Sequence, residues 1–253
     1  MHGAQQRRVA LVTGSGRRRV GNVVAEALAG RGYDVALHYN RSAEDAGLAV
    51  ERLRAHGVEA AAYQADVADE DQVDRMFDQF FSRFHRLDVL VTAAAVWEPK
   101  PLEETTASDI IRQFEVNTLG TFLCCRRAGL MMVAQPEGGL IVTIGDWATE
   151  RPYPEYAAYF ASKGAVATLT RSFAVELARR NTAIRVNCVQ PGPVMLPENL
   201  SQPEVQGAVA GTLLKRAGRP ENVAQAVLFF LDNDYVTGVC LPVDGGRTIA
   251  GSD

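Results

Sequence analysis

The chain alternates between short, mostly apolar runs and longer stretches in which apolar residues recur at every third or fourth position. The short runs are four to seven residues long and are bounded by Gly, Asp or Asn, which is typical of parallel strands buried on both faces. We expect strands at Val9–Thr13, Asp34–Tyr39, Glu59–Ala65, Leu87–Thr92, Leu140–Ile144, Ile184–Gln190 and Cys240–Val243.

The longer stretches have the periodicity of amphipathic helices. They are Asn22–Arg31, Ala43–His56, Asp69–Phe84, Ser108–Ala134, Tyr156–Arg180 and Glu221–Asp232. Strands that alternate with helices predict an α/β fold, a single doubly wound parallel sheet of the Rossmann type with helices on both faces. Because no linker divides the chain, residues 1–253 are predicted to form one domain. The region from Pro191 to Pro203 holds four prolines, and it predicts a functional loop of about 191–217, such as a lid over a ligand.

Composition narrows the class of protein. The 253 residues are 47% apolar and 22% charged, as in ordinary globular domains, and the net charge of −4 disfavours nucleic acid as a partner. No apolar run approaches the ~20 residues that a membrane span needs, and Val9 to Val12 is too short for a signal-peptide core. We therefore predict a cytoplasmic protein with a small-molecule ligand and without a membrane partner. The cysteines and histidines show no metal-binding spacing, and we expect no metal and four reduced, buried thiols: Cys124, Cys125, Cys188 and Cys240.

The turn after the first strand carries the signs of a phosphate loop. It reads Thr13-Gly14-Ser15-Gly16-Arg17-Arg18-Arg19-Val20-Gly21 and runs directly into a helix. Glycines at such a turn let the backbone approach a pyrophosphate, which then lies at the helix N-terminus. Since the match to G-x-G-x-x-G is imperfect, the three consecutive arginines are the more informative feature; a solvated basic turn is the alternative.

The end of the second strand indicates which dinucleotide is bound. In this fold an acid there selects NAD, whereas an arginine accommodates the 2′-phosphate of NADP. The chain has no acid at the strand tip and instead reads Asn40-Arg41-Ser42, which offers a guanidinium and short hydrogen-bond donors. We predict NADP(H) as the cofactor.

A tyrosine and a lysine lie one helical turn apart on the helix that follows the fifth strand. The spacing of Tyr159 and Lys163 places both side chains on one face of the helix. An ammonium group beside a phenol favours the phenolate, so we expect the pKa of Tyr159 to be lowered and its proton to be exchangeable with a substrate. Such a pair is common on helices by chance, and it gains meaning from its place after a strand of a dinucleotide-binding fold.

Together with further motifs, this pair resembles the short-chain dehydrogenases/reductases over almost the whole chain. The matching residues are Thr13-Gly14, Ala65-Asp66-Val67, Asn117, Tyr159-x-x-x-Lys163, Arg185-Val186-Asn187, Pro191-Gly192 and Val243-Asp244-Gly245-Gly246. The resemblance implies a Rossmann-type oxidoreductase, usually a homotetramer, in which Asn117, Tyr159 and Lys163 belong to a catalytic tetrad. It also implies that the main-chain carbonyl of Asn117 holds a water that links Lys163 to solvent.

Two departures from the family pattern bear on the chemistry. The family's Asn-Asn-Ala-Gly after the fourth strand reads Thr92-Ala93-Ala94-Ala95, and the tetrad serine, thirteen residues before the tyrosine, is replaced by Asp146. An ionised aspartate only accepts hydrogen bonds, so it suits a substrate that presents N–H groups or needs a proton at nitrogen. Asp before Tyr and Lys resembles the pteridine reductase branch, as do Arg19 and the run from His38 to Ser42. That resemblance implies that Trp97 stacks on a pterin; a lid anchor is its alternative role.

The predicted site residues follow from these motifs and from the resemblance. The catalytic residues are Asp146, Tyr159, Lys163 and Asn117, and the substrate contacts are Trp97, Asp146 and Tyr159. The predicted cofactor contacts are Gly14, Arg17, Arg19, Val20, Asn40, Arg41, Ser42, Asp66, Val67, Ala93, Ala94, Ile144, Tyr159, Lys163, Pro191, Gly192 and Val194. Asp66 has a second interpretation as a helix-capping acid, Asn117 as a buried polar residue that binds backbone, and Trp147 as a residue packed under the substrate loop.

Three functions remain open at this point. The first is hydride transfer from NADPH to a conjugated C=N bond of a pterin or another flat heteroaromatic substrate, with Tyr159 delivering the proton directly or through Asp146. The second is the reduction of a carbonyl group, as in a 3-oxoacyl thioester, with Asp146 protonated. The third is an NADP-binding regulator without catalysis, which the intact Tyr159 and Lys163 disfavour.

Overall fold

The computed structural model describes residues 7–196 and 200–250, and in this part of the chain seven parallel strands form one sheet in the order β3-β2-β1-β4-β5-β6-β7. The strands are β1 (Val9–Thr13), β2 (Asp34–Tyr39), β3 (Ala60–Gln64), β4 (Val89–Thr92), β5 (Gly139–Ile144), β6 (Ile184–Pro191) and β7 (Cys240–Val243). The strand order reverses between β1 and β4, which is where such sheets bind ligands. The predicted Rossmann-type fold is confirmed.

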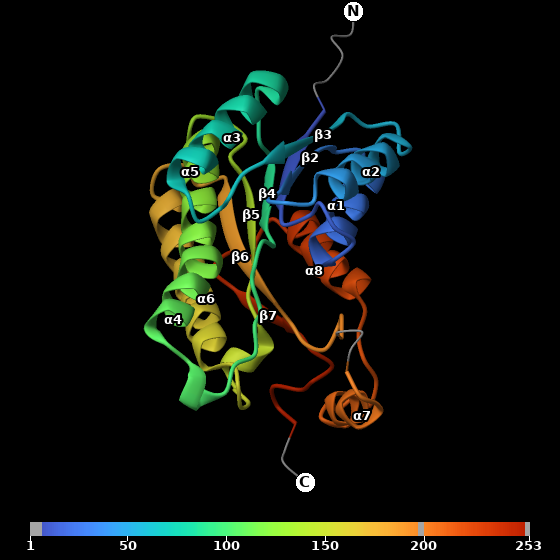
Figure 1. Ribbon diagram of the computed structural model, residues 1–253. Coiled ribbons are helices and arrows are strands. Elements are labelled where there is room, and N and C mark those ends of the chain that lie inside the picture. Colours follow the sequence, from blue (N-terminus) through green and yellow to red (C-terminus); the bar gives the residue numbers. More distant parts are fainter. Residues whose placement is uncertain (1–6, 197–199, 251–253) are drawn as a thin grey trace, which may run out of the picture.

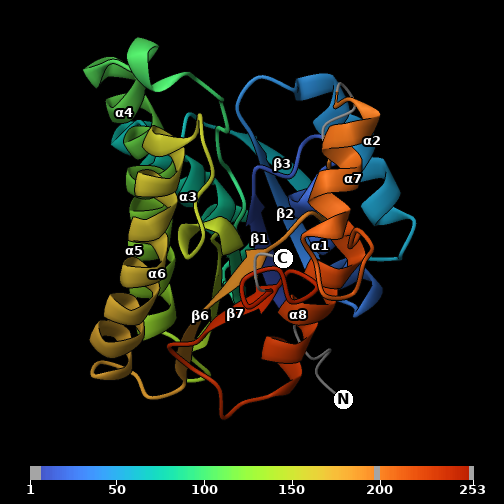
Figure 2. The ribbon, with the colours of Figure 1, turned by 90° about the horizontal axis from the view of Figure 1, so that it is seen from below.

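Helices cover both faces of the sheet (Figure 1). One face carries α1 (Val20–Gly30), α2 (Ala43–Arg54) and α8 (Pro220–Asp232), and the other carries α3 (Glu70–Phe84), α5 (Gly120–Val133) and α6 (Ala157–Ala178). Figure 2 shows the same two layers from below, with α7 (Gln202–Ala210) on the side of α1 and α8. These bounds agree with the predicted helices to within two residues, except for the two differences described below.

The hydrophobic runs of the strands divide between two cores, one on each face of the sheet. In β1, Val12 packs into the core under α1 and α8, whereas its neighbour Leu11 packs into the core under α3 and α5. Because successive side chains of a strand point to opposite faces, a sheet covered on both sides needs continuous apolar runs. Each fully buried Leu or Phe side chain, such as Leu37 or Phe77, contributes about 1.5–3 kcal/mol to folding.

Three features of the fold differ from the prediction. The predicted helix Ser108–Ala134 is divided into α4 (Ala107–Phe114), a π turn (Glu115–Leu119) and α5. The loop predicted at about 191–217 contains α7, whose nine residues are all exposed or half-buried. Residues 197–199 of that loop lie outside the described residues. β7 is an edge strand with half-buried and exposed residues, so Cys240 is half-buried, whereas the other three cysteines are buried as predicted.

No helix in the described ranges is long and apolar enough to cross a membrane. Within the same ranges, His, Cys, Asp and Glu side chains form no group of three or more that could hold a metal ion.

Candidate active site

The ends of β1 and β4 meet at the point where the strand order reverses. Gly14 follows β1 with φ of 63°, and a Cβ atom added to it would lie 2.6 Å from the backbone nitrogen of Ala94. A side chain is therefore excluded by the close approach of the two chains as well as by the left-handed backbone. The amides of Ala93 and Ala94 both donate to Thr13 Oγ1, at 3.1 and 3.2 Å, and fix the distance between the two strand ends. The predicted cofactor contacts Gly14, Ala93 and Ala94 thus lie together.

The start of α1 is open and surrounded by positive charge. No side chain in the described part of the protein caps this helix, so the first backbone N–H groups are available to an anion. Arg17, Arg18 and Arg19 are exposed around the turn, and Arg17 forms an ion pair with Asp45 at 3.4 Å. Val20, the first residue of the helix, packs its side chain against the hydrophobic core. This donor set fits the phosphates of a dinucleotide.

The tip of β2 lies beside the same turn. A Cβ atom on Gly16 would lie 2.9 Å from Ser42 Oγ, so Ser42 contacts the loop directly. Asn40 and Arg41 are exposed next to it. The residues predicted to select NADP are therefore brought to the edge of the phosphate loop.

A buried histidine joins three strand ends around this loop, and the sequence analysis gave it no separate role. His38 is 2% exposed; its Nδ1 accepts from the Gly14 amide at 3.0 Å, and its Nε2 lies 3.0 Å from the Ala65 carbonyl. Nδ1 must be unprotonated to accept, so Nε2 carries the proton and the ring is neutral. Burial lowers the pKa of His38 accordingly.

We expect His38→Phe to lower the free energy of unfolding by about 1–3 kcal/mol, because the Gly14 amide and the Ala65 carbonyl lose their partner. In the wild type, stability should fall as the pH drops below 6.5, the ordinary pKa of histidine, since the unfolded chain then binds a proton that folded His38 refuses. Urea unfolding on both sides of that pH measures both effects. The exposed His56 provides the control variant His56→Phe, and an unchanged pH slope in His38→Phe would contradict the assignment.

The predicted catalytic residues converge at the carboxyl end of β5. Tyr159 and Lys163 lie on α6 and are 6% and 4% exposed, and Asp146 follows β5. The Tyr159 hydroxyl donates to Asp146 Oδ2 at 2.8 Å, and Lys163 Nζ donates to the carbonyl of Ile144 at 2.8 Å. The second carboxylate oxygen of Asp146 accepts from the Ala148 amide at 2.8 Å, which fixes the carboxylate.

The electrostatics of this group differ from the expectation in one respect. Burial and the adjacent Asp146 carboxylate raise the pKa of Tyr159 well above its ordinary value of 10.0. The predicted lowering by Lys163 is therefore wrong for the chain as described, since the ammonium is directed to the Ile144 carbonyl instead of the phenol. Burial also raises the pKa of Asp146 and lowers that of Lys163. The Tyr159 hydroxyl therefore keeps its proton over the neutral range.

Asn117 lies in the π turn and is completely buried. Its side-chain amide accepts from the Val96 amide at 2.8 Å and donates to the Val96 carbonyl at 3.0 Å and to Ser162 Oγ at 3.0 Å. This is the backbone-binding role considered for it above. Its carbonyl accepts from Thr121 Oγ1 at 2.7 Å. Asn117 thus connects the segment after β4 to Ser162 of α6, the residue that directly precedes Lys163.

Aromatic rings form a wall beside Asp146 and Tyr159. Trp97 stacks on Tyr156 with ring centroids 4.9 Å apart and an interplanar angle of 16°. Tyr153 packs edge-on against Tyr156 and is stacked at 6.3 Å on Trp147. One face of Trp97 is thus covered by protein, while 40% of the residue stays exposed. Tyr153 and Tyr156 were not among the predicted site residues. The several aromatic residues just before Tyr159 are the sequence signal that could have indicated such a wall.

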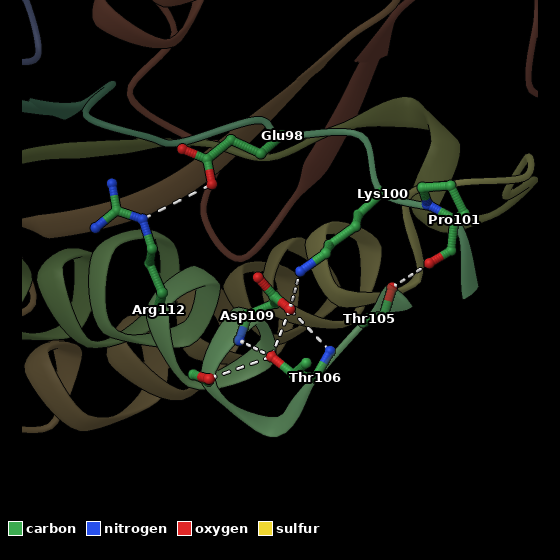
Figure 3. Close-up of polar contacts among 8 residues, drawn as sticks. Glu98, Lys100, Pro101, Thr105, Thr106, Asp109 and Arg112 are labelled. Carbon is green, nitrogen blue, oxygen red and sulfur yellow. Dashed lines mark hydrogen bonds and ion pairs between the residues drawn. The ribbon is translucent and has the colours of Figure 1, made fainter. Parts of the chain in front are cut away.

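The segment that carries Trp97 is held at its other end by polar contacts (Figure 3). Lys100 Nζ contacts Asp109 Oδ2 at 2.7 Å, and that carboxylate also accepts from the Thr106 amide in the capping box of α4. Arg112 pairs with Glu98 at 3.7 Å, and the Lys100 amide donates to the Glu155 carbonyl at 2.7 Å. The segment is therefore fixed to α4 on one side and to the stretch before α6 on the other.

An arginine near the C-terminus closes the site on the side of α7. The guanidinium of Arg247 lies 4.7 Å from the centroid of the Trp147 ring, in cation–π geometry, and also donates to the Ala208 carbonyl of α7. Trp147 therefore packs against Arg247, which in turn contacts α7, and this is close to the role under the substrate loop considered for it above. Arg247 itself was not predicted, because a lone arginine after Asp244-Gly245-Gly246 carries no pattern.

The remaining predicted cofactor residues lie at the same edge of the sheet. Asp66 accepts from the Ala68 amide at 3.0 Å, whereas Asp69 caps α3, so the helix-capping interpretation of Asp66 is wrong. Val67 is buried against Gly120. After β6, a Cβ atom on Gly192 would lie 2.5 Å from the Asp244 backbone, and Pro191 and Val194 flank this contact.

Comparisons with known proteins agree with this architecture. The sequence model of a family described as enoyl-(acyl carrier protein) reductase matches residues 15–248. The chain is 36% identical to the uncharacterized oxidoreductase YgfF of Escherichia coli K12, covering 94% of this chain and 99% of that protein. It is 35% identical to a 3-oxoacyl-[acyl-carrier-protein] reductase of Synechocystis, covering 95% and 97%. The crystal structure of an acetoin dehydrogenase from Enterobacter cloacae matches with a TM-score of 0.88 and 33% identity over 98% of both chains.

Proposed function

The chain belongs to the short-chain dehydrogenase/reductase family of oxidoreductases, and from this premise we propose that it is an NADPH-dependent reductase of a flat substrate with a conjugated C=N bond, such as a dihydropterin. The observation that carries the proposal is the hydrogen bond from Tyr159 to Asp146 at 2.8 Å beside an aromatic wall. Reduction of a C=N bond requires a proton at nitrogen, and a phenol paired with a carboxyl group supplies it.

The side chains of the site divide the work between them. NADPH, when bound, supplies the hydride. Tyr159 keeps its proton at neutral pH because its pKa is raised, so it acts as the acid of the reduction. Asp146 accepts hydrogen bonds from substrate N–H groups, and burial, which raises its pKa, favours its return of a proton to Tyr159. Lys163 is held by the Ile144 carbonyl, and its ammonium would bind a ribose hydroxyl of the cofactor.

The shape of the site supports a flat substrate. Trp97, Tyr153 and Tyr156 present one continuous set of rings above the Asp146–Tyr159 pair. Offset stacking of a heteroaromatic ring on such a wall adds about 0.5–1.5 kcal/mol beyond the burial of its area. Steady-state oxidation of NADPH against dihydrobiopterin, dihydrofolate and dihydromonapterin tests the proposal. Good turnover of ketones without turnover of any dihydropterin would overturn it.

The preference for NADPH is supported by Arg41 and its neighbours at the tip of β2. We expect Arg41→Ala to raise the KM for NADPH about 10- to 100-fold, because one charge-assisted contact to the 2′-phosphate is lost. The KM for NADH, which has no 2′-phosphate, should stay within about three-fold of the wild-type value. Initial rates with each cofactor measure this. Arg54→Ala, at the far end of α2, is the matched control. An equal rise in the KM for both cofactors would argue against the 2′-phosphate contact.

A second function is favoured by two observations. Burial raises the pKa of Asp146, and a protonated carboxyl group could donate to a carbonyl oxygen as the usual serine does. The 3-oxoacyl-[acyl-carrier-protein] reductase of Synechocystis is 35% identical to the chain. Reduction of a 3-oxoacyl thioester or a ketone is therefore the alternative proposal.

The predicted homotetramer is also a proposal. An apolar groove formed by α4, the π turn, α5 and α6 is lined by Ile111, Phe114, Glu115, Thr118, Leu119, Phe122 and Leu169. A second copy of the chain covering this groove would remove large exposed side chains such as Ile111 and Phe122 from water. Sedimentation equilibrium that gives the mass of a single chain would refute the proposal. The cytoplasmic location stays a prediction of the sequence.

A further inference from the structure

Two cysteines face each other across the last two strands of the sheet. Cys188 of β6 is in register with Cys240 of β7. They continue a row of register partners, Thr13, Thr92 and Thr143, which crosses the sheet at its carboxyl end. Register partners in neighbouring parallel strands point to the same face, here the face under α6, because Thr143 Oγ1 lies 2.7 Å from Thr170 Oγ1 of that helix.

The separation of the two strands suits a covalent bond between these cysteines. Adjacent strands lie about 4.7–4.9 Å apart, within the range of Cα separations that a disulfide bridges. The Cys188 thiol donates to the Val189 carbonyl at 3.5 Å, and the two thiols are near enough for each to shift the pKa of the other. The register and the shared face of the sheet therefore place the two side chains next to each other.

The two thiols have unequal roles. The neighbouring Cys188 thiol and the charge of Arg171 lower the pKa of Cys240 to about 7, and the proximity of Cys240 together with burial raises the pKa of Cys188. Cys240 lies half-buried on the edge strand, where solvent reaches it, whereas Cys188 is buried. Cys240 thus has the properties of an attacking thiolate and Cys188 those of a resolving thiol.

We propose that Cys188 and Cys240 form a peroxide-reactive dithiol that closes to a disulfide between β6 and β7. The Cys240 thiolate attacks one oxygen of hydrogen peroxide, which gives a sulfenic acid and hydroxide. The Cys188 sulfur then attacks the sulfenyl sulfur, the S–S bond forms, and water leaves. In total, two thiols and one peroxide yield one disulfide and two waters, with sulfur oxidised and peroxide reduced.

The dithiol adjoins the candidate active site. A Cβ atom on Gly145 would lie 2.9 Å from Cys188 Sγ, and the Gly145 amide donates to the Val189 carbonyl at 2.8 Å. Gly145 directly precedes Asp146. If the Cys188 sulfur moves toward Cys240, Gly145 loses a packing contact, and the position of the Asp146 carboxylate changes with it. This coupling rests on the proposed function, whereas formation of the disulfide does not.

Differential alkylation and peptide mass spectrometry of the full-length protein, before and after hydrogen peroxide, test the dithiol. We expect a loss of two hydrogens, with Cys188 and Cys240 protected together and both exposed again by dithiothreitol. Cys124 and Cys125 serve as internal controls, since burial raises the pKa of both and both should stay free thiols. In Cys240→Ser no disulfide should form, and in Cys188→Ser dimedone should trap a sulfenic acid on Cys240. Equal oxidation of all four cysteines, or a bond only between Cys240 residues of two copies, would overturn the proposal.

Measurements of NADPH-dependent turnover test whether the disulfide affects the active site, separately from whether the disulfide forms. Oxidised wild type should lose NADPH-dependent turnover about five- to ten-fold, dithiothreitol should restore it, and Cys240→Ser should not change under peroxide. A disulfide without a change in turnover would refute the coupling alone. If neither redox state turns over a substrate, the proposed function fails, while the mass spectra still decide the dithiol.

Discussion

Replacement of Tyr159 by Phe is expected to lower kcat for NADPH-dependent reduction by about 100- to 10,000-fold, the range that positioned proton transfer contributes. The variant keeps the ring, which packs at 5.4 Å against Phe160, and loses only the hydroxyl that donates to Asp146. Binding of NADPH should change little because the phosphate loop is unaffected. The effect should therefore appear in kcat at saturating cofactor, and cofactor fluorescence should give a nearly unchanged Kd.

The neighbouring Tyr156 provides a demanding control. Tyr156→Phe keeps the ring that stacks on Trp97 and removes a hydroxyl from the same wall, but that hydroxyl does not pair with Asp146. We expect its kcat to stay within about three-fold of wild type, as for a substitution that removes no reacting group. If both variants lose activity equally, the wall acts as a unit and Tyr159 is not the proton donor. If neither variant loses activity, Tyr159 does not deliver the proton.

The sequence predicts the sheet well because each strand is buried on both faces. In a continuous apolar run such as Val9–Thr13, alternate side chains pack into the two cores on opposite faces of the sheet. The ends of such a run therefore predict the ends of the strand. α7 escapes prediction for the opposite reason, since it buries no side chain fully and its residues show no helical apolar period. Its readable signals are the pair Ser201 and Glu204, which forms a capping box, and Pro203 in the first turn of the helix.

The site is predictable in its residues and less so in its electrostatics. Motif spacing brings Asp146, Tyr159 and Lys163 together, as the structure shows. The direction of the Tyr159 pKa could not be predicted, because it depends on which oxygen Lys163 reaches and on how deeply the phenol is enclosed. The role of His38 could not be predicted, because its two backbone partners, Gly14 and Ala65, lie in turns that are distant from it in the sequence.

Replacement of Asp146 by Ser separates the two proposed reactions. Serine is smaller than aspartate and is the residue that the resemblance to the family implies at this position, so we expect the variant to fold and to bind cofactor. We expect reduction of dihydropterins to fall about 100-fold, since the carboxylate that accepts substrate N–H groups and relays the proton is lost. Reduction of ketones or 3-oxoacyl thioesters should stay unchanged or rise, because a hydroxyl can donate to the substrate oxygen. The ratio of kcat/KM values for the two substrate classes is the quantity to measure.

The pH profile of the same variant tests the electrostatic basis of the proposal. The Asp146 carboxylate raises the pKa of Tyr159 both by its charge and as a hydrogen-bond acceptor, so its removal should lower that pKa. Reduction requires protonated Tyr159; the alkaline limb of kcat should therefore move to lower pH in Asp146→Ser than in wild type. Asp146→Asn removes the charge but keeps the size, and should move the limb in the same direction. A dihydropterin activity that survives in both variants, with an unmoved alkaline limb, would show that Asp146 takes no part in proton delivery, and the carbonyl alternative would then be favoured.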